Sequence, residues 1–260
     1  RSLLPQFKRW YSQAGTPRLT VQTHYDASAQ TYTLDIAQHA PPTPGQPEKL
    51  PFVIPVSLGL VGPDGHDMPL QLAGETHAGA GTRTVVLTET QQQLQFVNVA
   101  TEATPSLLRG FSAPVVLELP YTDLHLLHLL AHDSDAFNRW EAGQRLMLRR
   151  ALGFVNAHTA NLGAAGPIHD SVELDAPFVQ AMQSVLRHPE LDAAFKELTL
   201  TLPSETYIAE QLPSADPQVV HAVREGMRAQ LAKHLHADWA WAFDAHQNNG
   251  SYTPDAISSG

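Results

Sequence analysis

The sequence predicts two successive folds, an immunoglobulin-like β-sandwich and then an α-helical, solenoid-like domain. Residue usage changes near residue 120: 13 of the 20 prolines lie in the first 120 residues, and 10 of the 14 histidines lie after them. Short alternating β-branched runs fill the first part, whereas apolar residues at helical spacing fill the second. Because proline separates short strands and is disfavoured inside helices, this shift indicates an all-β half followed by an all-α half.

The bulk composition is that of a globular protein with an acidic surface. Of 260 residues, 43% are apolar and 16% charged, and the formal net charge is −10. This balance argues against nucleic acid and against an anionic membrane as partners, since both require clustered Lys and Arg. The absence of cysteine excludes a disulfide framework and a thiolate metal site, and it is compatible with the cytoplasm.

Seven short runs form the expected sandwich. The residues Asp26 to Gln30 read as a hairpin turn between the first two runs, and Pro51 and Pro55 indicate that the third run lies at a sheet edge. Seven strands in about 100 residues fit the size of an immunoglobulin-like domain. The expected strands are 19–25, 31–38, 52–60, a run near Leu70, 84–87, 94–99 and 115–119.

Helix signals dominate the second half. The first helix is expected to bury Leu124, Leu127 and Ala131, and Ser134 is expected to cap the next one. Cap-plus-proline pairs then predict later helices. The expected later features are a break at 161–166 and helices at 178–186 after Pro177, at 190–198 after Pro189, at 205–212 capped by Ser204, and from Asp216-Pro217 through His234 and onward to about Asn248.

The ends of the sequence differ from both halves. Leu4 to Ser12 carries Phe7, Trp10 and Tyr11 at helical spacing, and the chain begins at Arg1 without a methionine. We therefore expect a piece of a longer polypeptide, with apolar surface exposed at Trp10 and Tyr11 and again at Trp239 and Trp241. The expected division is 1–17, the end of an upstream helix; 18–120, the sandwich; and 121–260, the first part of a helical domain.

The strongest metal-site candidate is the histidine series His125, His128 and His132, which shares one helix face. Neutral imidazoles bind zinc, but the metallopeptidase motif H-E-x-x-H needs a glutamate that activates the zinc-bound water. Leu129 stands where that glutamate belongs, and none of the 14 histidines precedes a glutamate. We interpret the series as a helix face that happens to hold histidines, and we expect no metal there.

Other catalytic patterns have no match in the sequence. There is no cysteine, no G-x-S-x-G nucleophile turn and no glycine-rich phosphate loop. Asp133, Asp135 and Glu141 form an acidic group at a helix start, where acids complement the helix dipole.

Several segments resemble the bacterial aminopeptidase N (alanyl aminopeptidase) family of zinc exopeptidases, and the resemblance spans essentially the whole chain. The matching segments are Phe7 to Pro17, Tyr32 to Leu34, Thr43 to Lys49, Ile54-Pro55, Phe111 to Val115, His132 to Ala142, Leu200 to Glu205 and Asp216-Pro217.

This resemblance implies a parent enzyme that removes N-terminal residues from peptides with one zinc ion in an upstream catalytic domain. In the family, that domain carries H-E-x-x-H and a G-x-M-E-N segment, and neither occurs here. No catalytic or zinc-binding residue therefore carries over to this chain. The implied role is a non-catalytic spacer and the first part of a helical cap, with the parent's catalytic domain and downstream helices as partners.

Two alternatives stay open at this point. The chain could be a peptide- or protein-binding module without enzyme activity, because immunoglobulin-like folds serve many binding functions. It could also be a metal protein built on His125, His128 and His132, which metal analysis before and after His128→Ala would test.

Overall fold

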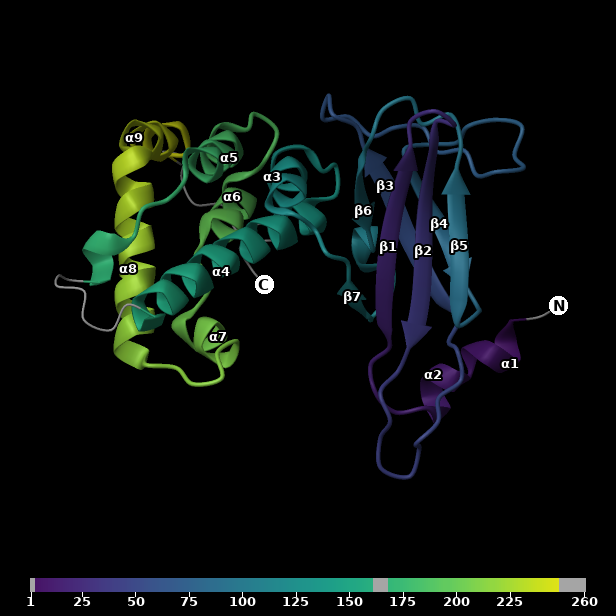
Figure 1. Ribbon diagram of the computed structural model, residues 1–260. Helices are drawn as coiled ribbons and strands as arrows, with labels where there is room; N and C mark the ends of the chain where they lie inside the picture. Colours follow the sequence, from purple (N-terminus) through teal and green to yellow (C-terminus); the bar gives the residue numbers. More distant parts are fainter. Residues whose placement is uncertain (1–2, 161–167, 248–260) are drawn as a thin grey trace, which may run out of the picture. The chain divides into compact units, whose positions relative to one another are not determined.

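The computed structural model describes residues 3–160 and 168–247 (Figure 1). The chain divides into two compact units, Arg1–Leu146 and Met147–Gly260, with the boundary inside one long helix. The first unit holds a β-sandwich with short helices, and the second unit is helical (Figure 1). The predicted order of a β-sandwich followed by a helical domain is confirmed.

Two sheets form the sandwich in the first unit. One has the strand order β5-β2-β1-β7 and the other β4-β3-β6. All neighbours are antiparallel except β1 and β7, which run parallel from Arg18 beside Val116. The strands are β1 (Arg18–Asp26), β2 (Thr31–His39), β3 (Ile54–Val61), β4 (Thr82–Leu87), β5 (Gln91–Phe96), β6 (Thr104–Leu107) and β7 (Val116–Glu118).

Alternation of apolar residues explains the core of the sandwich. In β1, Leu19 and Val21 are buried, and in β2 Leu34 and Ile36 are buried, because successive strand residues point to opposite faces. The same face of β2 buries Gln38, whose side-chain amide forms two hydrogen bonds with the backbone of Phe52. Gln38 Oε1 accepts from Phe52 N at 2.7 Å, and Gln38 Nε2 donates to Phe52 O at 3.1 Å. A polar residue is tolerated here because its hydrogen-bonding groups are satisfied.

Two strand assignments from the sequence were wrong. Leu70 is buried but lies in an irregular segment, whose isolated bridges join Asp67 to Val61 and Leu72 to Phe96. The strand β6 was not expected, because its sequence, with Pro105 between Thr104 and Ser106, lacks the alternating apolar pattern of a strand. All four residues of β6 are buried, and β6 pairs with the last half of β3.

The expected edge position of the third strand was also wrong, since β3 is the middle strand of its sheet. Pro55 nevertheless pairs only with Val86 of β4, and the pairing of β3 with β6 begins at Leu58. The missing N–H of proline therefore falls on the stretch of β3 that has one partner strand. Pro55 thus correctly indicated a stretch of β3 with one partner strand. It did not indicate that β3 as a whole lies at the edge of its sheet.

The N-terminal segment forms two short helices, α1 (Leu4–Phe7) and α2 (Arg9–Ser12), rather than one. It is fixed to the sandwich by side chains that donate to backbone oxygens: Gln6 Nε2 to Thr88 at 2.6 Å, Trp10 Nε1 to Val53 at 2.9 Å, and Arg9 to Pro51. The Trp10 ring also packs on Phe52, with ring centroids 4.7 Å apart.

The first helix after the strands is α3 (Asp123–His132), capped by Thr122. It buries Leu126, Leu129 and Leu130, whereas Leu124 is 76% exposed. The expected face of Leu124, Leu127 and Ala131 was therefore wrong, because in a leucine-rich helix spacing alone does not choose between neighbouring stripes. Helix α4 (Ala136–Ala160) follows, and Asp135 rather than Ser134 accepts from its first turn, at Asn138 N.

The remaining helices belong to the second unit, where the predicted caps Ser204 and Asp216 are confirmed. Helix α6 begins later than expected, after its N-cap Asp192 rather than at Pro189. The last predicted helix is interrupted at Leu235, and the break predicted at 161–166 lies outside the described residues. The elements are η2 (Ile168–Ser171), α5 (Ala176–Arg187), α6 (Ala193–Leu200), α7 (Glu205–Glu210), α8 (Pro217–His234) and α9 (His236–Ala245).

Over the described ranges, every helix is too short or too polar to cross a bilayer.

Candidate functional site

The most highly organised polar site in the first unit is built around Arg109, in the short helix η1 (Arg109–Phe111) that follows β6. Three residues there have positive φ: Leu108 at 61°, Gly110 at 62° and Phe111 at 53°. Left-handed backbone is unfavourable for leucine and phenylalanine, so the surrounding structure must hold it in place. The result is a turn that buries the Arg109 side chain to 3% exposure.

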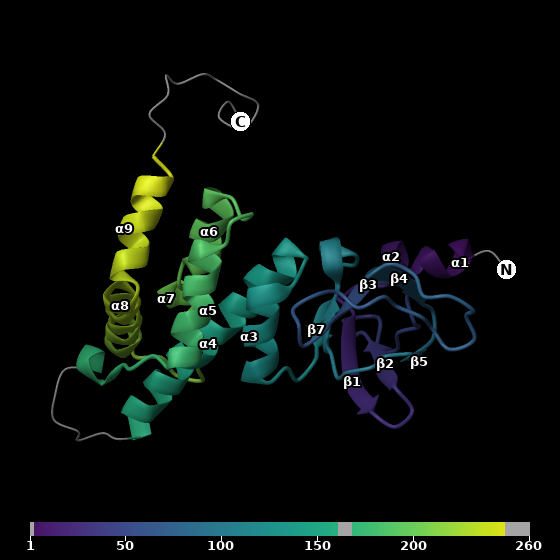
Figure 2. The same ribbon diagram turned by 90° about the horizontal axis from the view of Figure 1, so that it is seen from above.

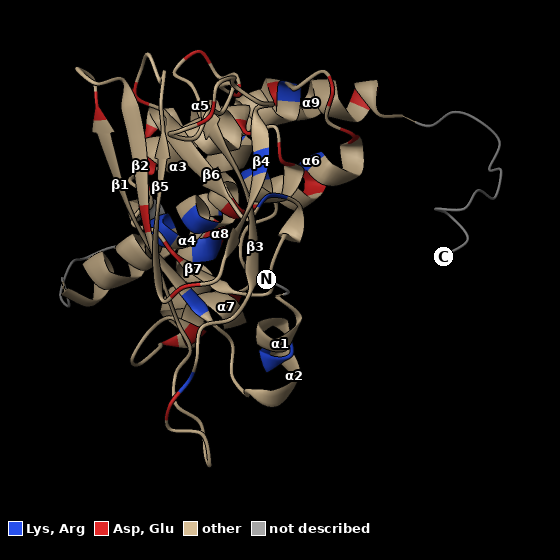
Figure 3. Ribbon diagram, turned by 90° about the vertical axis from the view of Figure 1, so that its right-hand side faces the viewer, with Lys and Arg blue, Asp and Glu red and all other residues tan. Residues whose placement is uncertain are grey.

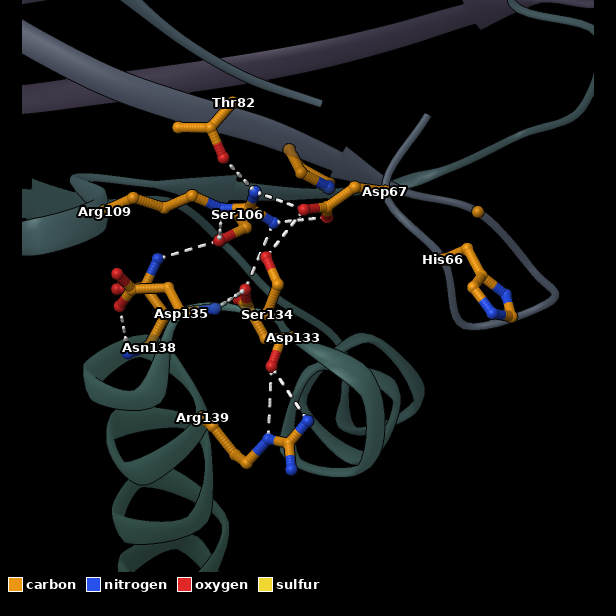
Figure 4. A network of polar contacts seen from close by, with 12 residues as sticks. His66, Asp67, Thr82, Ser106, Arg109, Asp133, Ser134, Asp135, Asn138 and Arg139 are labelled. Atoms are coloured by element: carbon orange, nitrogen blue, oxygen red, sulfur yellow. Dashed lines mark hydrogen bonds and ion pairs between the residues drawn. The ribbon is translucent and has the colours of Figure 1, made fainter. Parts of the chain in front are cut away.

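All five N–H donors of the Arg109 guanidinium have an acceptor (Figure 4). Nε donates to Ser106 Oγ at 2.9 Å. Nη1 donates to Asp67 Oδ2 at 2.8 Å and to Thr82 Oγ1 at 2.7 Å. Nη2 donates to Asp67 Oδ1 at 2.7 Å and to Asp133 Oδ1 at 3.1 Å. This full use of the donors, including a bidentate pair with Asp67, leaves the guanidinium no donor for a ligand.

Two glycines make room for this network. A Cβ on Gly59, in β3, would lie 2.3 Å from Arg109 Cζ, and a Cβ on Gly81 would lie 2.6 Å from Asp67 Cβ. Neither glycine has a positive φ, so each is needed for space rather than for backbone freedom. The guanidinium can therefore lie directly against the β3 backbone.

The helical side of the network comes from the junction of α3 and α4. The Asp133 backbone oxygen accepts from Arg139 Nη2 at 2.9 Å, and Asn138 Nδ2 donates to Ser106 Oγ at 2.8 Å. The Asp135 carboxylate accepts hydrogen bonds from both sides of the junction, from Asn138 N in α4 at 2.9 Å and from Gly110 N in the Arg109 turn at 2.8 Å. Strand β6, the Arg109 turn and the α3–α4 junction are thus joined by charge-assisted hydrogen bonds (Figure 4).

The two carboxylates of the network titrate differently. Burial raises the pKa of Asp67, but its hydrogen bonds from Arg109 and Ser134 outweigh that and leave the pKa below its ordinary value. Asp133 is fully buried, and burial raises its pKa because the attraction of Arg109 offsets the loss of water only in part. Its Oδ2 atom has no hydrogen-bond partner.

The three candidate histidines all lie on α3, where His128 and His132 are neighbours and His125 lies apart from them. His128 Nε2 contacts the Gly62 oxygen at 2.8 Å, and the His132 ring packs on Gly65, whose φ is +81°. Their ring centroids are 4.9 Å apart, whereas His125 takes part in the helix cap with Thr122. Across residues 3–160 and 168–247, no three or more His, Asp or Glu side chains are grouped so that they could hold a metal ion.

The three acidic residues grouped by the sequence, Asp133, Asp135 and Glu141, form different interactions. Asp133 and Asp135 enter the Arg109 network, while Glu141 accepts from Arg145 Nε at 2.8 Å within α4. Along the ribbon, Lys and Arg are interspersed with Asp and Glu (Figure 3).

Asp67 and Arg109 are site residues that no sequence motif had indicated. A signal for Arg109 existed: it is the only charged residue from 103 to 117. A lone cation in an uncharged stretch that borders strands is a candidate for burial with partners, because arginine is rarely buried without them.

Family models match nearly the whole chain. Residues 15–120 match a domain of unknown function, DUF3458, described as an Ig-like fold. Residues 123–260 match its companion, DUF3458_C, described as ARM repeats.

Curated relatives are similar to the chain at the level of a common family. The sequence is 35% identical to aminopeptidase N of Escherichia coli over 232 residues, which cover 89% of this chain and 25% of the relative. It is 36% identical to aminopeptidase N of Haemophilus influenzae, covering 91% and 26%, and 35% identical to that of Caulobacter vibrioides, covering 99% and 27%. The chain thus spans about a quarter of the length of these relatives.

A solved structure has the same fold. A chain of Legionella pneumophila aminopeptidase A, crystallised in complex with aspartic acid, superimposes with a TM-score of 0.73 over 97% of this chain and 26% of its own. The two sequences are 24% identical, so this likeness bears on the fold alone.

Proposed function

We infer the function of this chain from the family to which it belongs, the DUF3458 family of paired Ig-like and ARM-repeat domains. We propose that it is the non-catalytic spacer and the first part of a helical cap in a zinc aminopeptidase. The functional division would follow the composition, with 18–120 as spacer, 121–260 as cap, and 1–17 as the end of an upstream helix.

One observation carries this proposal: the chain aligns along most of its length with aminopeptidases N but covers only about a quarter of them. The chemistry that cleaves a peptide bond would then reside in the remaining three quarters. The sequence agrees, because no histidine here precedes a glutamate and H-E-x-x-H therefore does not occur. We propose that no residue of this chain is catalytic and that His125, His128 and His132 bind no metal.

The Arg109 network supports the spacer role. A spacer must transmit position, and a joint between β6 and the α3–α4 junction whose guanidinium donors are all satisfied resists bending more than a flexible linker does.

The N-terminal helices support contact with an upstream catalytic domain. Their inner side is held by Gln6 and Trp10, while Leu4, Phe7 and Tyr11 remain 58%, 42% and 84% exposed. An exposed apolar group of this kind is typical of a surface that another domain covers.

The remaining parts of the proposal concern the full-length protein. It would hold one zinc ion in its catalytic domain, act on the N-terminal residues of peptides, contact neither nucleic acid nor membrane, and reside in the cytoplasm. Cell fractionation tests the compartment.

Turnover of alanyl p-nitroanilide tests the function. The full-length protein is expected to cleave it and to bind one zinc ion per chain by atomic absorption, whereas the pure 260-residue chain should do neither. Turnover or stoichiometric zinc in the 260-residue chain would overturn the proposal, as would a zinc-free, inactive full-length protein. Capture of a peptide by the 260-residue chain but not by the full-length protein would favour a binding module instead.

A further inference from the structure

Helix α9 has the composition of a buried helix but is mostly exposed. Seven of its ten residues from His236 to Ala245 are alanine, tryptophan or phenylalanine, yet Asp238 and Ala242 are its only buried residues. Trp239 and Trp241 are each 36% exposed, and Phe243 is 70% exposed. A helix with so many large apolar side chains is normally covered on more than one face. The residues that the structure describes therefore leave α9 only partly covered.

A groove runs beside this helix within the second unit. It has a volume of about 550 Å³, and its lining is mainly apolar, with Leu186 of α5, Leu200 of α6, and Trp239 and Phe243 of α9 among the lining residues. Figure 2 shows α9 and α6 side by side, and both contact α5. The groove is large enough to receive several side chains.

Lys196 of α6 also lines this groove and is only 4% exposed. Its ammonium lies 5.7 Å from the centroid of the Trp241 ring. Arg187 lies over the same ring at 4.2 Å, but Arg187 has a carboxylate partner, Asp238, at 2.7 Å.

The Lys196 ammonium, by contrast, forms no ion pair or hydrogen bond with any residue that the structure describes, although the Lys196 backbone N–H donates to Asp192 O at 3.0 Å. Buried ammonium groups normally have an anionic partner, because a ring face alone does not replace the lost water.

We propose that an amphipathic helix of the following ARM repeat covers this groove in the full-length protein and directs an aspartate or glutamate carboxylate at Lys196 Nζ. Repeats of solenoid proteins bury their apolar faces against the next repeat. An occupant of that size also covers Trp239 and Phe243, which a small carboxylate in the groove would leave in water. The inference rests on the proposed function, since it requires the chain to continue into further repeats.

Amine labelling tests the cover directly. The 260-residue chain and the full-length protein are treated with a hydroxysuccinimide ester, and acylation of Lys196 and of the exposed Lys233 is followed by mass spectrometry. Lys196 is expected to react at least tenfold more slowly in the full-length protein, while Lys233 keeps its rate. An equal rate for Lys196 in both proteins would overturn the proposal, whether or not the full-length protein cleaves peptides.

Thermal melting of matched variants tests the carboxylate. Lys196→Met in the full-length protein should lower the midpoint of thermal unfolding by several degrees, because it leaves the partner carboxylate buried without a cation. In the 260-residue chain the same change should leave the midpoint unchanged or raise it, and Lys233→Met should alter neither protein. A Lys196→Met effect no larger than that of Lys233→Met in the full-length protein would contradict the pairing.

Two further arms exclude other occupants. Slower Lys196 acylation as the concentration of the full-length protein rises would assign the groove to a second copy. Slower acylation upon addition of sodium octanoate to the full-length protein would assign it to a small apolar carboxylate. Either result overturns the proposal of an intramolecular helix.

Discussion

Arg109 illustrates how one side chain can depend on residues far apart in the sequence. Its acceptors lie between 3 residues away, at Ser106, and 42 residues away, at Asp67. Lysine could not replace it, because an ammonium offers three donors from one point whereas the guanidinium uses five from a planar fork. No local period in the sequence predicts such a set. Asp135 could be predicted as a helix-start acid, but the burial of Asp133 could not, because it follows from tertiary contacts.

The two carboxylates that contact Arg109 predict opposite pH responses. The pKa of Asp133 is raised in the folded protein, so the folded state holds more protons than the unfolded state above the ordinary value of 3.8. Stability then falls as pH rises through the folded pKa of Asp133. Asp133→Asn removes this loss, so the stability of the variant relative to the wild type should increase from pH 4 upward, as measured by urea unfolding at a series of pH values.

Asp67→Asn is the matched comparison for that measurement. The pKa of Asp67 is lowered on folding, so its ion pair stabilises the protein above pH 3.8 and is lost as pH falls through the folded pKa. The Asp67→Asn variant should therefore be less stable than the wild type at neutral pH, and the difference should shrink in acid. If the stability of both variants relative to the wild type changed with pH in the same direction, the opposite pKa shifts of Asp133 and Asp67 would be contradicted.

At the scale of elements, sequence patterns predicted a strand or helix well where hydrogen bonds within one turn determine it. They predicted it less well where packing against distant residues determines it. The caps at Ser204 and Asp216 follow from side-chain hydrogen bonds within one turn, and both were predicted. Strand β6 was missed because Thr104-Pro105-Ser106 becomes a strand only beside β3. The buried side of α3 was misjudged because five leucines offer more than one stripe.

Glycines in different elements predict stability changes of opposite sign. Gly59→Ala places a Cβ 2.3 Å from Arg109 Cζ and should cost about 2–4 kcal/mol, since it displaces a buried charge from its partners. Gly153 lies exposed within α4 with nothing within 4 Å of an added Cβ. Gly153→Ala should therefore stabilise the protein by about 0.5–1 kcal/mol through helix propensity. Urea denaturation of both variants measures the difference, and a Gly59→Ala protein as stable as the wild type would contradict the packing.

At the scale of the whole molecule, composition placed the change of fold near residue 120, whereas the compact units divide between Leu146 and Met147. The difference has a physical cause. The α3–α4 junction bonds to β6 and Arg109, so α3 and the start of α4 belong with the sandwich by contact although they are helical by sequence. Sequence patterns report local structure, and the division into units reports which segments hold each other in place.

The apolar surface at the N-terminus predicts how the 260-residue chain behaves in solution. The rings of Phe7 and Tyr11 meet edge to face, with centroids 6.4 Å apart, and both are exposed beside Leu4. Grouped apolar side chains drive association, whereas single ones do not. The chain should therefore self-associate at tens of micromolar, and sedimentation velocity over a range of concentrations measures this.

Substitution on the outer side of these helices should weaken that association. Phe7→Ser with Tyr11→Ser removes the grouped rings but keeps the Gln6 and Trp10 bonds that hold the segment to the sandwich. Leu124→Ser, at a residue that is 76% exposed on α3, removes an apolar side chain elsewhere and should have little effect. A chain that remains monomeric at every concentration, or an equal effect of Leu124→Ser, would mean that the N-terminal helices do not form a contact surface. The same double substitution in the full-length protein should lower its stability, because this surface would there be covered by the upstream domain.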